Sequence, residues 1–178
     1  IIYLGDQFEN MFVYEHTVKD ENGTEKKENE TYGIAYTYGI IGIVYNSAEL
    51  VNNAPEILEH IEKGGAGWEV MFGIPKRDEN GNFLYDANGA MMLDMDDPEN
   101  KKFNEAYLKI SGQILQFNNP RDAFGSAMYY LGIDVNNPSE DDWRAAYGLL
   151  AMQKNYVQGY VMDEIYNKME SGEAAMVP

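Results

Sequence analysis

The stretch that most constrains the fold is residues 114–132, which predicts a strand that turns directly into a helix. Residues 114–117 form a short apolar run, and residues 118–122 follow with an Asn cap, a Pro at the first helical position and an early acid. The apolar side chains of the predicted helix recur at i, i+3, i+4 and i+7, and they are Phe124, Ala127, Met128 and Leu131. Gly132 is expected to end the helix.

The rest of the chain predicts the same alternation of elements. We expect a buried strand over residues 39–46, a helix over 55–63, a second helix that begins at Ser139, a third over 163–172 and a strand over 174–177. Alternating strands and helices with short connections are typical of α/β domains. We therefore predict an α/β domain in which helices pack on a largely parallel or mixed sheet.

Two segments share the tetrapeptide Asp-Glu-Asn-Gly, at residues 20–23 and 78–81. Asn-Gly supplies the positive φ angles that a tight hairpin turn requires. Both segments are therefore expected to form β-hairpins or long surface loops that project from the domain.

Composition excludes several classes of protein. The chain has 13 Lys and Arg against 30 Asp and Glu, a formal net charge of −17, and no Cys. Nucleic acid and anionic lipid are excluded as partners because both require clustered cations, whereas a cationic ligand is favoured. On charge alone, a soluble, self-repelling surface is the favoured interpretation, ahead of any ligand. No apolar run approaches the ~20 residues of a membrane span. Because the chain begins Ile1-Ile2-Tyr3, we expect it to be a segment of a longer protein.

Motifs for catalysis and metal binding are missing from the sequence. The two histidines, His16 and His60, lie far apart, and no nucleophile triad, phosphate loop or paired-His motif occurs. The segment that begins at Asp78 resembles the start of a calcium loop, but Phe83 and Gly89 occupy the positions that require Gly and Glu. The acidic run at residues 94–99 is expected to be a solvated loop. We therefore predict no enzyme, no catalytic residue, no metal site and no cofactor.

The turn at residues 118–122 is the candidate ligand site. In open α/β sheets, ligands bind outside the carboxyl ends of the strands, where loops lead into helices. A helix N-terminus would keep the carboxyl of Asp122 ionised and leave its outer face to an ammonium group. The alternative is that Asp122 only caps its own helix. The sequence of the turn favours neither role, ligand contact or helix cap.

Several stretches resemble the extracellular solute-binding proteins of polyamine (spermidine/putrescine) ABC transporters. Residues 32–46 are similar to the family pattern Y-x-x-P-Y-x-W-G-T-x-G-I-x-Y-N, and residues 112–124 to the family's strand-to-helix segment. Residues 157–164 and 171–175 continue the resemblance in the family's order. The resemblance therefore covers most of the chain.

The resemblance implies two α/β lobes that close on a ligand like a hinged clamp. Residues 1–178 match the second lobe only, a lobe of a periplasmic-binding-protein-like (class II) fold with a mixed or parallel sheet flanked by helices. Relative to the family, the chain carries two hairpin-like insertions, at about residues 15–31 and 76–102.

The resemblance also implies ligand-binding residues, namely Asp122, Asn119, Asn118 and Tyr38. Asp122 takes the place of the family's polyamine-binding acid, which is commonly a Glu. Asn119 stands where some members have an Asp, and Tyr38 stands where a Trp is usual.

The implied function is the capture of putrescine or spermidine outside the cell and its delivery to the transporter permease. Carboxylates would bind the ammonium groups and aromatic faces the methylenes, and no bond would be made or broken. We expect a monomer at the extracellular face of a bacterial membrane, as a lipoprotein or fused to a permease, or in the periplasm. The alternatives are a binding lobe for another small solute, such as an amino acid or a sugar, an enzyme, or a sensory or adhesion domain.

Overall fold

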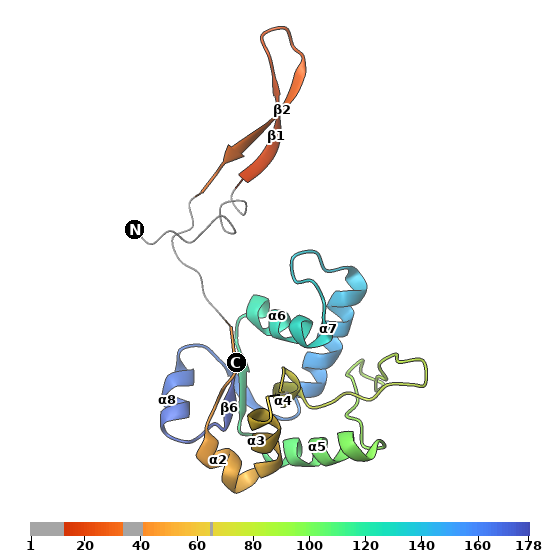
Figure 1. Cartoon of the computed structure of the whole chain (residues 1–178), viewed down its shortest axis with the longest axis vertical. Coiled ribbons are helices and arrows are strands. Elements are labelled where there is room, and N and C mark those ends of the chain that lie inside the picture. Colours follow the sequence, from red (N-terminus) through yellow and green to blue (C-terminus); the bar gives the residue numbers. More distant parts are fainter. Residues whose placement is uncertain (1–12, 34–40, 65) are drawn as a thin grey trace. The chain divides into compact units, whose positions relative to one another are not determined.

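The computed structural model describes residues 13–33, 41–64 and 66–178 (Figure 1). The chain divides into two compact units, residues 1–40 and residues 41–178, and each is described by itself. Tyr38, one of the expected ligand-binding residues, and residues 39–40 of the expected strand lie outside the described residues.

The described part of the first unit is a β-hairpin. Strand β1 (Val13–Lys19) pairs antiparallel with β2 (Glu25–Thr31). The carboxylate of Asp20 closes the turn, because Oδ1 accepts hydrogen bonds from the backbone N–H groups of Asn22 and Thr24, at 2.8 and 2.9 Å. Gly23 has a φ of 78°, so the predicted Asn-Gly turn is confirmed.

The second unit is built on a mixed sheet with the strand order β3-β6-β4-β5. Strand β4 (Ile114–Phe117) lies parallel to β5 (Val157–Val161) and to β6 (Met176–Val177), while β3 (Val44–Tyr45) is antiparallel to β6. The expected α/β class, with helices flanking a mixed sheet, is confirmed.

Seven helices surround the sheet in the part of the chain that the structure describes. They are α2 (Ser47–Asn53), α3 (Pro55–Glu62), α4 (Glu69–Phe72), α5 (Pro98–Lys109), α6 (Pro120–Leu131), α7 (Glu140–Gln153) and α8 (Glu164–Glu170). None of them is long and apolar enough to cross a membrane.

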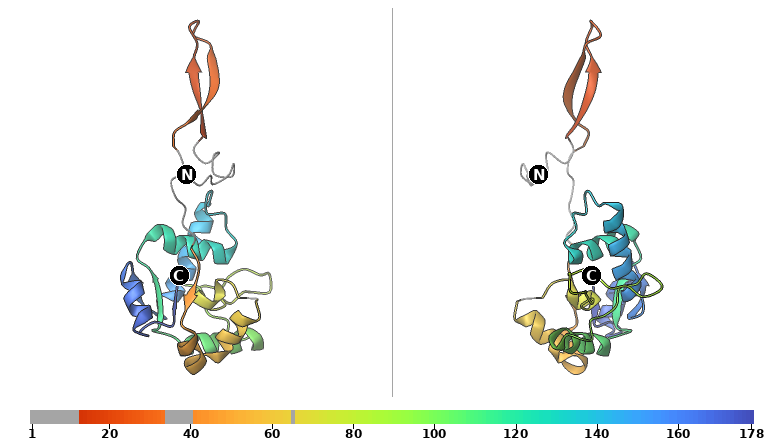
Figure 2. Two further views of the ribbon diagram at one scale, coloured as in Figure 1. Left: turned by 60° about the vertical axis from the view of Figure 1, so that its left-hand side comes forward. Right: turned by 90° about the vertical axis from the view of Figure 1, so that its right-hand side faces the viewer.

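The two faces of the sheet carry different cores. Leu115 and Val177 pack against Ile165 and Met169 of α8. The neighbouring residues on their strands, including Ile114, join the large cluster formed with the other helices. This alternation is the period-two pattern of a strand buried on both faces. Figure 2 shows α8 on one side of the sheet and the remaining helices on the other.

Most predicted elements are confirmed at close to the predicted bounds. Helices α3, α6 and α8 and strands β4 and β6 lie within the expected ranges, and α7 begins directly after the expected Ser139. Asn119 caps α6, since its Oδ1 accepts from the Arg121 N–H, and Gly132 ends the helix with a φ of 71°. Ser139 and Asp142 form the capping box of α7.

Two expectations are wrong. The buried strand expected over residues 39–46 is, within its described part, only the two-residue β3, and Val44 is 58% exposed. Its exposure follows from its position at the edge of the sheet, where only β6 pairs with it. The acidic run at 94–99 is not simply a solvated loop, because Asp94 is buried and Asp97 caps α5, which begins at Pro98.

Residues 75–93, here called the arm, form three short segments that close on one another. The Leu84 N–H donates to the Lys76 carbonyl at 3.0 Å, and the Met92 N–H donates to the Leu84 carbonyl at 3.1 Å. The Lys76 N–H donates to the Met92 carbonyl at 2.7 Å, which closes the set. These residues are eight positions apart, as are the turn residues Asp78 and Asp86. Each of these carboxylates accepts from the amides two and four residues later. The predicted turn at 78–81 is thus confirmed.

The arm contacts the rest of the second unit in two places. At its base, the buried Asn104 of α5 accepts from the Ile74 N–H at 2.7 Å and donates to the carbonyl groups of Ile74 and Asp94. Just after its second turn, the Met91 N–H donates to the Gly148 carbonyl of α7 at 2.9 Å. A Cβ at Gly148 would lie 2.6 Å from Cε1 of Tyr85, so glycine is required for this contact.

A buried amide network joins the sheet to three helices. Nε2 of Gln116, on β4, donates to Oε1 of Gln153 on α7 at 3.1 Å and lies 3.4 Å from Oγ of Ser126 on α6. Nε2 of Gln153 donates to the Met71 carbonyl of α4 at 2.8 Å. The three polar side chains are fully buried, so each of these bonds is made without competition from water.

We expect Gln153→Leu to lower the free energy of unfolding by about 1–3 kcal/mol, because two buried hydrogen bonds are lost: the Gln116 amide keeps only the longer contact with Ser126, and the Met71 carbonyl keeps only the Tyr107 hydroxyl. Urea-induced unfolding followed by circular dichroism measures the loss. The control is Gln158→Leu on the exposed side of β5, which should change stability by less than about 0.5 kcal/mol. Equal effects of the two substitutions would contradict the role given to the network.

We expect Gly148→Ala to destabilise the chain by about 1–3 kcal/mol, because the added methyl group collides with the ring of Tyr85. The matched control is Gly125→Ala in α6, where nothing lies within 4 Å of the new Cβ. That substitution should stabilise by about 0.5–1 kcal/mol through helix propensity. Stabilisation by both substitutions would show that the arm does not depend on Gly148.

Candidate ligand-binding site

The turn between β4 and α6 lies at the carboxyl ends of two parallel strands. The Asn118 N–H donates to the Val161 carbonyl at 2.9 Å, which ties the end of β4 to the end of β5. Asn119 and Pro120 then begin α6. The structure thus places the predicted residues Asn118, Asn119 and Asp122 on one strand-to-helix connection at the expected edge of the sheet.

Asp122 does not cap α6. The capping oxygen belongs to Asn119, and within the described residues the only hydrogen-bond partner of the Asp122 carboxylate is the Arg121 side chain. Nε of Arg121 donates to Oδ1 at 2.9 Å, and Nη2 lies 3.4 Å from Oδ2. This hydrogen bond raises the pKa of Arg121. The Asp122 side chain is 18% exposed, whereas that of Arg121 is 83% exposed, so a mostly buried carboxylate is paired with an exposed cation.

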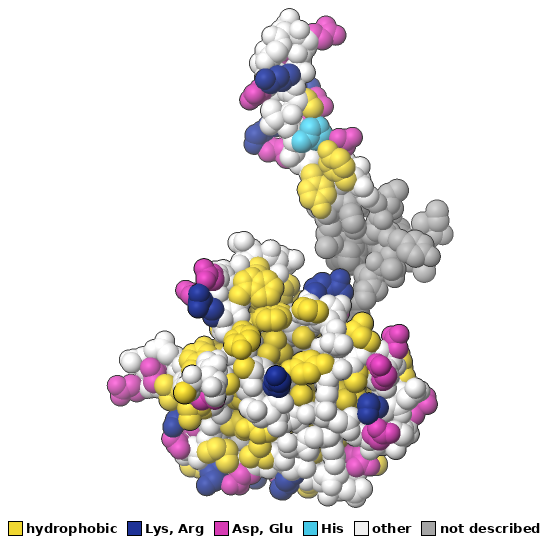
Figure 3. Space-filling model, turned by 180° about the vertical axis from the view of Figure 1, so that it is seen from behind, with side chains coloured by type: hydrophobic (Ala, Val, Ile, Leu, Met, Phe, Trp, Pro, Cys, Tyr) yellow, Lys and Arg dark blue, Asp and Glu magenta, His cyan; other side chains and the backbone are white. Residues whose placement is uncertain are grey.

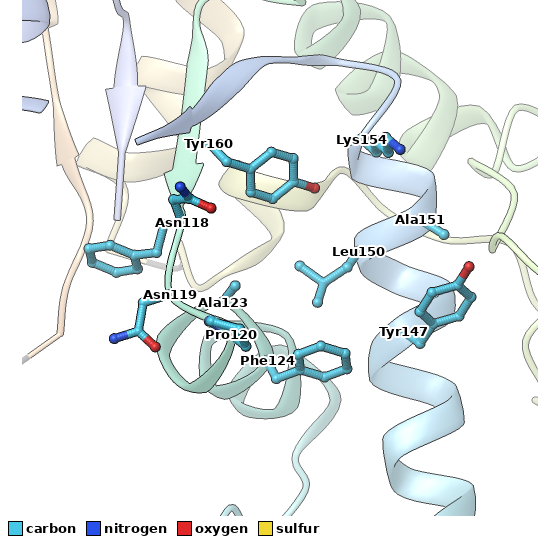
Figure 4. Close-up of a pocket in the computed structure, with 11 residues that line it drawn as sticks. Asn118, Asn119, Pro120, Ala123, Phe124, Tyr147, Leu150, Ala151, Lys154 and Tyr160 are labelled. Atoms are coloured by element: carbon cyan, nitrogen blue, oxygen red, sulfur yellow. The ribbon is translucent and has the colours of Figure 1, made fainter. Parts of the chain in front are cut away.

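A pocket of about 290 Å³ lies beside this turn. Asn118, Asn119 and the first turn of α6 form one wall, and α7 and β5 form the others (Figure 4). The residues that line it are Phe117, Asn118, Asn119, Pro120, Ala123, Phe124, Tyr147, Leu150, Ala151, Lys154 and Tyr160. Asp122 is not among them. In Figure 4 the amide of Asn119 points away from the space between Phe124, Leu150 and Tyr160.

The pocket is aromatic and carries one positive charge. Phe124, Tyr147 and Tyr160 present ring surfaces to it, and burial raises the pKa of Tyr160. Among the residues that line the pocket, Lys154 is the only Lys, Arg, Asp or Glu. The arrangement can hold apolar chains between rings, while a cationic group would be attracted at Asp122 rather than beside Lys154.

The residues that complete the pocket are not among those predicted from the sequence. Tyr147, Leu150 and Lys154 recur at i, i+3 and i+7 on α7, which is a signal for a shared face. Tyr160 carries no such signal, because its proximity depends on the pairing of β5 with β4. No group of His, Cys, Asp or Glu residues that could hold a metal ion occurs within residues 13–33, 41–64 and 66–178.

Comparison with known proteins gives two partial structural similarities. No protein-family model matches the chain, and no curated protein matches it. The crystal structure of the spermidine/putrescine ABC transporter substrate-binding protein PotD from Streptococcus pneumoniae, in complex with calcium and HEPES, is 20% identical, with a TM-score of 0.38, over 39% of this chain. The TpPotD lipoprotein of Treponema pallidum is 20% identical, with a TM-score of 0.37, over 38% of this chain.

The chain spans 22% of the length of either solved protein. At this level of similarity the two structures identify no family for the chain.

The cap at Asn119 predicts how two substitutions differ. Asn119→Ala should lower the free energy of unfolding by about 1 kcal/mol, because the Arg121 N–H loses its acceptor, whereas Asn119→Asp should cost only a few tenths, since Asp caps as well as Asn. Chemical denaturation measures both. Asn137→Ala, at an exposed position outside any helix, serves as the control. A loss with Asn119→Asp as large as with Asn119→Ala would contradict the capping role.

Proposed function

We propose that the chain is the second lobe of the solute-binding component of an ABC importer, and that it captures a polyamine such as putrescine or spermidine. One observation carries the proposal: the Asp122 carboxylate lies at the carboxyl edge of the sheet and is not used to cap α6. The order of family-like stretches along the sequence supports it. The function involves no chemical step, and we propose neither a catalytic residue nor a cofactor.

Arg121 occupies the place that an ammonium group would take. Its contact with Asp122 is a pair between neighbouring residues with an exposed guanidinium, and pairs of this kind contribute about 0–1 kcal/mol. A ligand ammonium can therefore replace Arg121 at low cost. Closure of a second lobe would remove water from the carboxylate and strengthen the new pair.

The neighbouring pocket is suited to the rest of such a ligand. Its rings can cover methylene groups, and a ring face attracts a cation by ~0.5–2 kcal/mol. Lys154 would repel an ammonium from the α7 side of the pocket. We therefore place the ammonium at Asp122 and the methylenes between Asn118 and Phe124.

The proposed setting is the outer face of a bacterial membrane or the periplasm, with a permease as partner. A lipid anchor or a fused permease would provide the link to the membrane. The two insertions, at about residues 15–31 and 76–102, belong to this lobe in the proposal.

We expect Asp122→Asn in the complete two-lobed protein to weaken binding of putrescine and spermidine at least about tenfold, because a charged hydrogen bond is lost. Isothermal titration calorimetry measures the affinity. The charge-matched control, Glu170→Gln at the exposed end of α8, should leave it unchanged. Absence of heat with any polyamine, together with normal binding of another solute, would overturn the proposal. Unchanged affinity in Asp122→Asn would remove Asp122 from the site.

Lys154 favours a second candidate, a solute that carries a carboxylate, such as an amino acid. The positive end of α6 and the Lys154 ammonium both border the pocket, and both attract anions. In that case Lys154→Met would abolish binding of the amino acid in the same calorimetric experiment, and Asp122→Asn would not.

A further inference from the structure

A second groove lies between the arm and α7, outside the strand-to-helix turn. Its volume is about 750 Å³. Four aromatic side chains line it, together with three charged residues at the start of α7, and the lining residues are Tyr85, Gly89, Phe124, Glu140, Asp141, Trp143, Arg144, Ala145 and Tyr147. Here it is called the arm groove. Figure 3 shows hydrophobic side chains gathered beside α7 and the arm, with charged side chains around them.

One wall of the arm groove is held in place by the contact at Gly148. The ring of Tyr85 lies directly on this glycine, and the Met91 N–H is bonded to its carbonyl. On the opposite side, the rings of Phe124 and Trp143 pack with their centroids 5.1 Å apart. Both walls are therefore held by packing contacts. Tyr85, Trp143 and Tyr147 nevertheless remain 45–56% exposed, so their faces are available to a ligand.

The charges in the arm groove favour a cation. Arg144 is neutralised by Glu140, at 2.6 Å. Asp141 has no ion-pair or hydrogen-bonding partner among the described side chains, so it leaves the groove with one negative charge in excess. The chain as a whole carries −17, which opposes docking of a second copy and of any polyanion.

We propose that the arm groove binds a small organic cation with an apolar body, an alkyl- or arylammonium. The volume is that of a small-molecule site. The ring faces would hold the apolar body and attract the ammonium, and Asp141 would pair with it. Asp122 does not line the arm groove, so the inference does not depend on the proposed function, although Phe124 and Tyr147 line both the groove and the pocket at the strand-to-helix turn.

The test uses benzylammonium as the cation and benzyl alcohol as its neutral counterpart, added to the full chain. The chain has two tryptophans, and Trp68→Phe assigns the indole N–H signal of Trp143 in ¹H–¹⁵N NMR spectra. We expect benzylammonium to shift this signal in a saturable manner, and benzyl alcohol to bind markedly more weakly. Tyr85→Ala should abolish saturation, and Asp141→Asn should weaken binding about two- to fivefold.

Two further variants separate the possible causes. Asp122→Asn should leave the titration unchanged, which distinguishes the arm groove from the polyamine site. Tyr85→Phe should bind normally, which would show that a loss in Tyr85→Ala comes from the missing ring face. Equal shifts with benzyl alcohol, a shift that does not saturate, an unchanged affinity in Asp141→Asn, or saturable binding of a neutral sugar in place of the cation would each overturn the proposal.

Discussion

The buried amide pair of Gln116 and Gln153 is the interaction on which the arrangement of the second unit depends. It connects the central strand β4 to α7, and through the Met71 carbonyl to α4. A buried amide without a partner costs about 1–3 kcal/mol, so this network tolerates few other positions of its elements. The Phe117 N–H also donates to Oε1 of Gln116. The network therefore acts directly on the strand end from which the candidate site begins.

Local interactions made much of this fold predictable. The caps at Asn119 and Ser139 and the turn closed by Asp20 each involve groups no more than four residues apart, and the residue types at those positions are sufficient for the prediction. The same holds for the strand-to-helix turn that carries Asp122. Its place at the sheet edge followed from the apolar run at 114–117 and from the general rule for α/β folds.

The features that sequence analysis missed depend on contacts between distant residues. The exposure of β3 results from its edge position, which the strand order decides. The closed arm requires hydrogen bonds among Lys76, Leu84 and Met92. Its contact with α7 requires Gly148, which follows Met92 by more than fifty positions. From the sequence alone, a glycine within a helix indicates only a lower helix stability, and not a contact with another segment. The approach of Tyr160 to α7 likewise arises only once β5 has paired with β4.

The two candidate sites are physically connected, because Phe124 and Tyr147 line both of them. Both side chains project from α6 and α7, which Gln116 and its partners hold against the sheet. A ligand on one side of these rings that turns them must change the surface offered on the other side. Coupling between two binding sites is reciprocal in free energy, so occupation of the arm groove and occupation of the pocket at Asn118 would alter each other's affinity by the same factor. If both proposals hold, Tyr85 of the arm and Asn118 at the sheet edge contribute to sites that share Phe124 and Tyr147, although they lie far apart in the sequence.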